Sequence, residues 1–154
     1  MSEKIDGLTA LSRARNICAR QEQCKQDIRE KLHRWGLPEE EVQVVISKLE
    51  EEGFIDEQRY AGMFIREKFR LNKWGRIKLR YMLKQKHIPE TIIETSLGEI
   101  KEEEYIGLLA EELQKKMRTI KIHDKAVVHN QLVRFALQRG FEYEDIREAL
   151  KRLT

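Results

Sequence analysis

The sequence has few of the residues that are typical of disulfide-linked, metal-binding or loop-rich proteins. Cysteine occurs twice, at Cys18 and Cys24, and this spacing fits neither a metal knuckle nor a disulfide framework. Proline also occurs twice, at Pro38 and Pro89, and we expect each to open a helix. No apolar run approaches the roughly 20 residues that span a bilayer, and residues 1–6 show no apolar signal-peptide segment. We therefore expect reduced thiols in a cytoplasmic protein that enters no membrane.

Residue patterns that support catalysis or metal binding are also absent from the sequence. It contains four scattered histidines, His33, His87, His123 and His129. None has a partner at the three- or four-residue spacing that places two ligands on one helical face. There is no phosphate-cradling glycine loop, nucleophile elbow or Cys-x-x-Cys pair, and consecutive glutamates on a helix point in different directions. The sequence predicts no catalytic residue, no metal site and no cofactor.

What the chain does contain is an apolar pattern that occurs three times. When Pro38 is aligned with Pro89, 51 residues further on, the apolar positions superpose without a gap, so that Ile28 falls on Leu79. A shift of 104 residues brings Leu132 onto Ile28. With 40% hydrophobic and 37% charged residues, the composition favours three small cores in series over one compact core. We predict tandem repeats over residues 1–53, 54–101 and 102–154.

The apolar spacing of three and four residues predicts that nearly the whole chain is helical. The expected helices cover residues 8–20, 26–35, 38–52, 56–69, 76–86, 89–97, 102–117, 124–139 and 142–153. We expect Gly36, Gly53 and Gly140 to adopt left-handed conformations after helices, and His87 to do so at a conformational cost. The predicted fold is all-α, with three tandem three-helix repeats stacked as an elongated, curved array of either hand.

Charge is strongly segregated along the chain, although the net charge is only +3. Residues 66–86 contain nine basic residues and one acid, whereas eight acids and one lysine occur in each of the segments 39–57 and 90–112. A spacing of four places Arg76, Arg80 and Lys84 in one stripe, opposite the core-facing side of their helix. Such a surface indicates a polyanionic partner.

A simpler interpretation of this stripe is a solvated surface, or one that pairs with acidic helices of the same chain. Against it, the single acid among residues 66–86 does not supply the interleaved glutamates of helical ion pairs. Self-repulsion of this kind is commonly tolerated where a partner neutralises it. Trp74 has a ring face for stacking on a base, but a tryptophan beside a turn is more often a core plug, and we interpret it as one.

Three stretches of the chain carry a family resemblance: residues 49–61 (LEEEGFIDEQRYA), residues 74–88 (WGRIKLRYMLKQKHI) and, less sharply, residues 27–32 (DIREKL). They resemble the RecX family of bacterial recombination regulators. Together with the third repeat, the similarity covers nearly all of the chain after about residue 8. The sequence departs from the family at Cys24, where a hydroxyl residue often caps a helix, at the pair Tyr81-Met82, and at His87, where glycine is usual. We expect Cys24 to cap its helix less well than a hydroxyl.

The resemblance implies a non-enzymatic modulator, mainly a negative regulator, of RecA recombinase. Such a protein lies in the groove of the RecA filament on single-stranded DNA, limits filament growth, and lowers the ATPase, strand-exchange and co-protease activities of RecA. The implied partners are the RecA filament and single-stranded DNA, with double-stranded DNA as an alternative, and the implied context is homologous recombination, DNA repair and the SOS response. A curved rod with charges of both signs fits DNA phosphates and protein surface together. A monomer is our default expectation.

The candidate contacts to nucleic acid or filament are the basic residues Arg66, Arg70, Lys73, Arg76, Lys78, Arg80, Lys84 and Lys86. The signature residues to which we assign structural roles are Asp56, Arg59, Tyr60, Trp74 and Gly75. We place Asp56 and Arg59 in a buried or helix-capping role at the repeat boundary. Two other hypotheses stay open. One is a helical adaptor that binds only protein, and the other, with almost no support in the sequence, is an enzyme on a helical scaffold.

Overall fold

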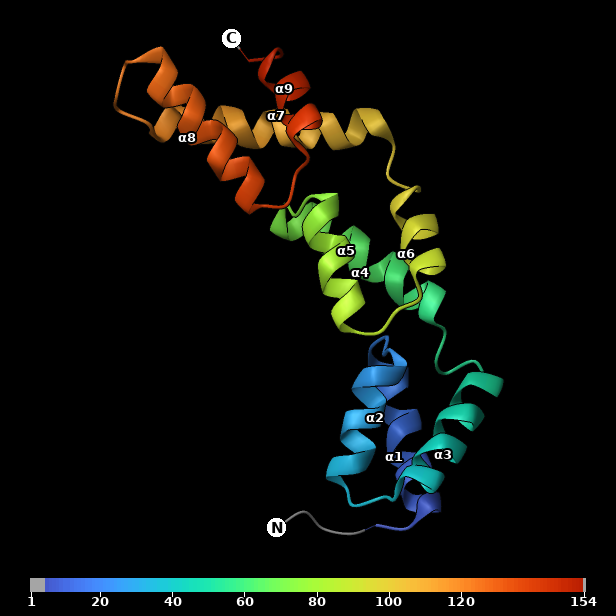
Figure 1. Ribbon diagram of the computed structural model, residues 1–154. Coiled ribbons are helices and arrows are strands. Elements are labelled where there is room, and N and C mark those ends of the chain that lie inside the picture. Colours follow the sequence, from blue (N-terminus) through green and yellow to red (C-terminus); the bar gives the residue numbers. More distant parts are fainter. Residues whose placement is uncertain (1–4, 154) are drawn as a thin grey trace.

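The protein is an elongated, curved array of helices in the computed structural model, which describes residues 5–153 (Figure 1). Those residues form nine α-helices and no strand: α1 (Gly7–Arg20), α2 (Lys25–Arg34), α3 (Glu39–Glu51), α4 (Glu57–Asn72), α5 (Arg76–Gln85), α6 (Glu90–Leu97), α7 (Glu102–Thr119), α8 (Lys125–Gln138) and α9 (Tyr143–Leu150). We call α1–α3 repeat 1, α4–α6 repeat 2 and α7–α9 repeat 3. The predicted all-α fold of tandem three-helix repeats is confirmed. The outer limits predicted for the first and third repeats, residues 1–4 and 154, lie outside the described residues.

Polar caps and prolines set the starts of the helices. The carboxylates of Asp6, Asp56 and Asp124 accept hydrogen bonds from backbone amides in the first turns of α1, α4 and α8. These bonds satisfy amides that have no partner inside the helix. We expected Pro38 and Pro89 to be the first residues of their helices. They are instead the N-cap residues of α3 and α6, because their ψ angles of 157° and 142° are not helical.

The helix ends show the predicted left-handed residues. Gly36, Gly53 and Gly140 have φ angles of 89°, 78° and 90°, and His87 has a φ of 59°. Lys73, which ends α4, also has a φ of 59° and was not predicted. A side chain in this region of φ/ψ space carries a steric cost that glycine avoids.

The apolar side chains form two clusters, not the three small cores that we expected. One cluster lies within repeat 1 and runs from Ala10 to Ile55. The second spans repeats 2 and 3 and includes one residue of repeat 1, the fully buried Cys24, which forms no side-chain cap on α2. The rings of Phe69 and Tyr105 stack at 5.7 Å, and those of Tyr105 and Phe141 lie 5.3 Å apart. These large rings cross the junction and merge the cores of repeats 2 and 3.

Polar contacts cross the other junction, between repeats 1 and 2. Nζ of Lys86 lies 2.7 Å from Asp27, and Nε of Arg59 lies 2.5 Å from Glu22. The backbone amide of Lys25 donates a hydrogen bond of 3.2 Å to the Glu57 carboxylate. Ion pairs and a hydrogen bond therefore link repeat 1 to repeat 2, together with the buried Cys24. No helix in the described part of the chain is both long and apolar enough to cross a membrane.

Candidate nucleic-acid interface

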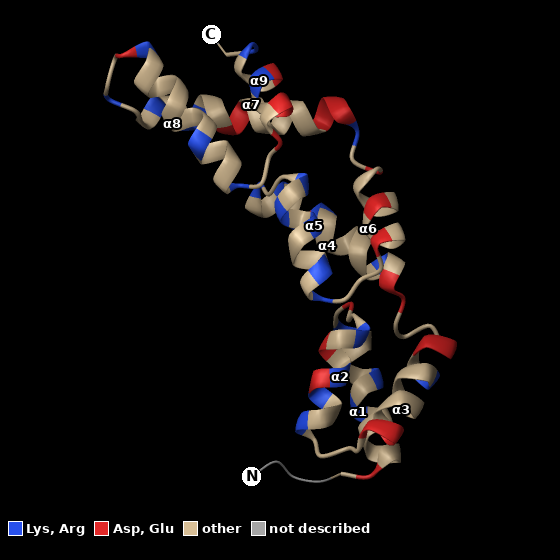
Figure 2. Cartoon of the chain, in the orientation of Figure 1, with Lys and Arg blue, Asp and Glu red and all other residues tan. Residues whose placement is uncertain are grey.

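Charge is unevenly distributed among the helices. Neither α5 nor α8 contains an acid, whereas α3 carries five glutamates and α7 begins with three. Figure 2 shows the acidic positions along the right edge of the view, on α3, α6 and the start of α7. The basic α5 thus lies between repeat 1 and an acidic part of repeat 3, and its residues have carboxylates within reach.

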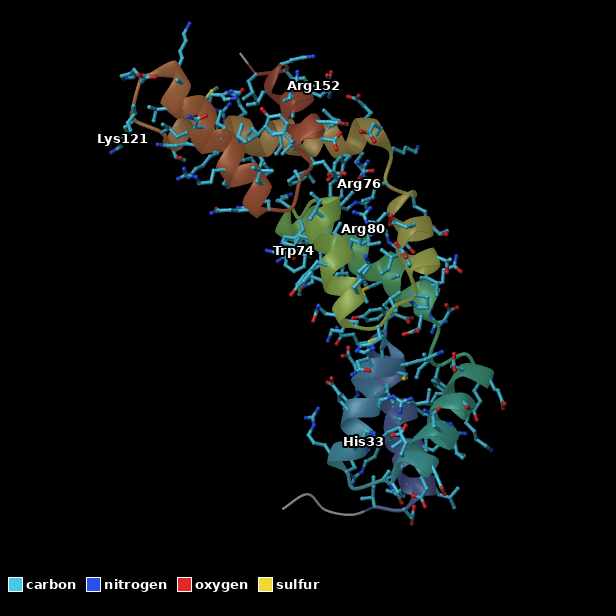
Figure 3. All side chains as sticks on the ribbon, in the orientation of Figure 1. His33, Trp74, Arg76, Arg80, Lys121 and Arg152 are labelled. Atoms are coloured by element: carbon cyan, nitrogen blue, oxygen red, sulfur yellow. The ribbon has the colours of Figure 1, made fainter. Side chains whose placement is uncertain are left out.

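Arg76 does not face solvent in the way that the predicted stripe required. Its side chain is 18% exposed, and the guanidinium binds Glu102 at 2.7 Å, Glu142 at 3.1 Å and Asp145 at 3.4 Å. The same group lies over the Tyr105 ring, 3.8 Å from the ring centroid. Figure 3 shows Arg76 where repeat 2 meets α7. We call these five residues the Arg76 cluster, and it links repeats 2 and 3.

The Arg76 cluster carries more negative than positive charge. Burial raises the pKa of Asp145 to about 6, and the neighbouring carboxylates of Glu142 and Glu102 add to the rise. Burial also raises the pKa of Tyr105, whose hydroxyl donates a hydrogen bond to Glu142 and accepts one from the Arg76 amide at 2.8 Å. Three carboxylates around one guanidinium repel phosphate, so this location does not favour nucleic acid.

Three more of the candidate basic residues pair with acids of the same chain. Arg80 binds Glu94 at 2.9 Å, Arg70 lies 3.4 Å from Glu104, and Lys86 binds Asp27 at 2.7 Å. Arg70, Arg76, Arg80 and Lys86 therefore fit the simpler interpretation, in which basic residues pair with acidic helices of the same chain. Arg66 is exposed on α4 and lines a small pocket with Arg70, Glu99 and Glu104.

The geometry of α5 explains why the three residues of the predicted basic stripe have different surroundings. Four residues advance an α-helix by about 400°, so each step along Arg76, Arg80 and Lys84 turns the side chain about 40° further around the axis. Arg76 and Arg80 lie at the flank that faces α7 and α6, where they meet acids, whereas Lys84 is exposed. Equal spacing along the sequence thus gives unequal surroundings.

A second basic group surrounds Trp74. Nζ of Lys78 lies 4.6 Å and Nζ of Lys68 lies 5.5 Å from the indole centroid, and Phe64 packs 6.3 Å away. Lys73 precedes Trp74 in the chain. We call Lys68, Lys73, Trp74 and Lys78 the tryptophan patch. Figure 3 shows Trp74 on the side of repeat 2 away from Arg76 and Arg80.

The indole of Trp74 is half-buried and packs against the core of repeats 2 and 3, as expected of a core plug. Its remaining surface is exposed next to the lysines of the patch. The ion pairs of the central repeat involve its arginines and Lys86, and within the described residues none involves the three lysines of the patch. Lys68 was not among our candidates. Its position four residues after Phe64, on the same helical face, is the signal that would have found it.

The other signature residues lie at repeat boundaries. Asp56 accepts the amide hydrogen of Arg59 at 3.0 Å, and the Arg59 side chain, which is half-exposed, also donates to the Gly53 carbonyl at 3.0 Å. Tyr60 is buried in the shared core, and Gly75 caps the start of α5. These residues hold helices together and offer no reactive group to a ligand.

The two cysteines and the potential metal ligands of the described residues show no sign of a reactive or metal-binding site. Burial raises the pKa of the Cys24 thiol to about 11 and also raises that of Cys18. A thiol that stays protonated is a poor nucleophile and a poor metal ligand. Within residues 5–153 no group of three or more histidines, cysteines or acids is placed to hold a metal ion.

Comparison with known proteins gives consistent matches to one family. The family models described as the first, second and third three-helix domains of RecX match residues 10–49, 56–97 and 102–150. A protein named "Regulatory protein RecX" from Clostridium acetobutylicum is 32% identical over 155 residues, which cover 98% of this chain and 72% of that protein. Another of the same name, from Prosthecochloris aestuarii, is 33% identical over 151 residues, which cover 96% and 95% of the two chains. The crystal structure of RecX from Lactobacillus salivarius superposes with a TM-score of 0.88 over 96% of both chains, and its 19% identity supports the fold alone.

Proposed function

The chain belongs to the RecX family of regulatory proteins, and from this premise we propose that it modulates RecA recombinase, mainly as a negative regulator. It binds the RecA filament on single-stranded DNA in the cytoplasm and limits extension of the filament. The ATPase, strand-exchange and co-protease activities of RecA fall as a result. The protein is a regulator and not an enzyme in this proposal.

The shape and the charge pattern support this role. A curved rod with a long surface relative to its mass can follow a helical polymer and contact several subunits. The acidic helices along one edge suit basic protein surface, while the lysines of repeat 2 suit phosphates. Both signs of charge then have a partner.

The tryptophan patch is the observation that carries the nucleic-acid part of the proposal. It combines three lysines that have no ion-pair partner within the described residues with an aromatic face, and phosphate binding with base stacking is how proteins hold single strands. Lys84 and Arg66 are also exposed in repeat 2, but Arg66 lies on another face of α4, beside Arg70 and Glu99. We assign Arg70, Arg76 and Lys86 to holding the repeats together, and Arg80 to holding α5 against α6 within repeat 2.

The experiment is the ATPase of RecA from the same organism, stimulated by single-stranded DNA, with this protein added well below stoichiometry. Wild type should lower the ATPase rate. A variant with glutamine at Lys68, Lys73 and Lys78 should lose most of this effect. The control carries the same change at Lys121, Lys125 and Lys151 of repeat 3, which removes equal charge elsewhere and should act as wild type.

Salt dependence separates phosphate contacts from other causes. Each phosphate neutralised on a single strand contributes about −0.7 to the slope of log affinity against log salt concentration, so the patch variant should have a slope less steep by about 2. An unchanged slope would remove the patch from the DNA interface. No effect of wild type on the ATPase would overturn the proposed function.

The internal pairing of four basic residues favours a second candidate, a helical adaptor that contacts protein and not nucleic acid. In that case the patch variant and wild type would regulate RecA equally, and neither would bind free single-stranded DNA with a salt-dependent affinity.

A further inference from the structure

An apolar groove lies between α1 and α3 in repeat 1, away from the tryptophan patch. It has a volume of about 440 Å³ and is lined by Asp6, Gly7, Leu8, Leu11, Glu41, Val44, Val45 and Lys48. Leu8 is 82% exposed and Val44 is 60% exposed, although both are large aliphatic side chains. Leu11 and Val45, which form the floor, are buried. We call this feature the α1–α3 groove.

The repeat architecture does not require apolar residues at this position. In repeat 2, 51 residues further on, Arg59 and Thr95 stand where repeat 1 has Leu8 and Val44, and Glu99 stands in place of Lys48. The corresponding hollow of repeat 2 is lined by polar side chains, including Arg59 and Glu99. Three helices therefore pack in the same way with a polar surface, so the aliphatic side chains of the α1–α3 groove are not there to build the fold.

Repeat 3 supports the same conclusion. A shift of 104 residues brings Glu148 onto Val44 and Arg152 onto Lys48. Glu148 is exposed, and Arg152 is held by Glu103 at 2.8 Å. Exposed aliphatic side chains at this position are thus confined to repeat 1, and clustered exposed apolar side chains indicate a binding surface.

Charges at the two ends of the groove indicate what it binds. Asp6 and Glu41 lie at the end formed by the starts of the parallel helices α1 and α3, and Lys48 lies at the other end. Within the described residues neither Glu41 nor Lys48 forms an ion pair. The matching ligand is aliphatic in the middle, basic at one end and acidic at the other.

The size of the groove favours a short helix over a second copy of the chain. Its lining covers about two turns of each helix, whereas a stable interface takes about 20–30 residues from each partner. An amphipathic helix that places two aliphatic side chains on one face fits such a site, as in helix-in-groove recognition. Apolar walls also make the groove unsuitable for phosphates.

We propose that the α1–α3 groove receives a short amphipathic helix exposed on the RecA filament, with a basic residue next to Asp6 and Glu41 and an acidic residue next to Lys48. The inference rests on the proposed function, since it assigns the protein contact to repeat 1 while the tryptophan patch contacts DNA. In this proposal the protein binds RecA through repeat 1, at one end of the rod, and DNA through repeat 2, in its middle.

The test compares wild type with Val44→Lys and with the matched control Thr95→Lys, which makes the same change at the equivalent exposed position of repeat 2. Binding is measured to RecA filaments assembled on single-stranded DNA with a non-hydrolysable ATP analogue, and separately to free single-stranded DNA. Val44→Lys should weaken filament binding about tenfold, because it places a charge in an apolar contact. It should leave the binding of free DNA unchanged, and Thr95→Lys should bind filaments as wild type does.

Four results would overturn the inference. Equal filament binding by Val44→Lys and wild type would show that the groove is not a filament contact, while leaving the proposed function intact. A wild-type dimer that Val44→Lys converts to a monomer, seen by light scattering, would assign the groove to a second copy. Methyl spectra of Leu8 and Val44 that change when residues 1–4 are deleted would assign it to the chain's own start. Failure of wild type to bind filaments at all would overturn the proposed function as well. Val44 is exposed, so an unchanged unfolding temperature should confirm that the variant folds.

Discussion

Gly75 and Gly140 hold repeats 2 and 3 in direct backbone contact. A Cβ added to Gly75 would lie 2.4 Å from the carbonyl oxygen of Gly140, and one added to Gly140 would lie 2.4 Å from Cβ of Lys78. The amide of Gly75 donates a hydrogen bond of 2.7 Å to the carbonyl of Arg139, and the amide of Ile77 donates one of 2.9 Å to that of Gly140. Any side chain on either glycine would push α5 away from the turn between α8 and α9.

Gly75→Ala should therefore lower the free energy of unfolding by about 2–3 kcal/mol, because the methyl group meets backbone atoms that cannot rotate away. Urea unfolding followed by circular dichroism measures the change. Gly107→Ala in α7 is the control. Its added Cβ meets no atom within 4 Å, so better helix propensity should raise stability by up to about 1 kcal/mol. Equal stability of the two variants would contradict the close contact.

The Arg76 cluster should make stability depend on pH. Because the folded pKa of Asp145 is raised from its ordinary value of 3.8 to about 6, the folded state binds more protons than the unfolded state between those values. The free energy of unfolding should then fall as pH rises from about 4 to about 6. Asp145→Asn, which cannot ionise, should lose this part of the dependence, whereas Asp56→Asn, at an exposed N-cap, should retain it. Urea unfolding at several pH values between 4 and 7 provides the measurement. Identical plots of unfolding free energy against pH for wild type and Asp145→Asn would refute the role of Asp145.

The two apolar clusters should open separately. Amides of α5 and α7 belong to helices that share one core and should exchange with solvent hydrogen through a common opening of high free energy. Amides of α2 and α3, packed in the smaller core of repeat 1, should exchange through an opening of lower free energy. Native-state hydrogen exchange at increasing denaturant concentration tests this. A single opening energy for all three repeats would count against two cores.

His87 offers a stabilising substitution. Its φ of 59° is a conformation that glycine adopts without a steric cost, so His87→Gly should raise the free energy of unfolding by about 1 kcal/mol. Gly36, which lies 51 residues earlier at the equivalent position with a φ of 89°, provides the reciprocal control. Gly36→His should lower the free energy of unfolding by a similar or larger amount. Thermal unfolding of both variants measures the two changes, and changes of the same sign would contradict the prediction.

Much of the architecture could be predicted because it depends on neighbours in the chain. The 51-residue period, the predicted helices and the left-handed glycines all follow from apolar spacing and from residues whose local conformational preferences are strong. Lys73 escaped prediction because a left-handed lysine has no local signal. The merging of two cores escaped it because Phe69, Tyr105 and Phe141 meet only when the repeats stack.

The basic run of repeat 2 shows the same division. The amino-acid sequence by itself determined that residues 66–86 are basic, that they lie on helices, and that acidic helices flank them. Only the tertiary structure decided which of these charges are used within the molecule, since Arg80 meets Glu94 across 14 residues of chain and Arg76 meets Asp145 across 69. Charges interact through space and not along the chain, so the packing of α5 against α6 and α7 left the lysines around Trp74 available to a partner and committed the arginines to the fold.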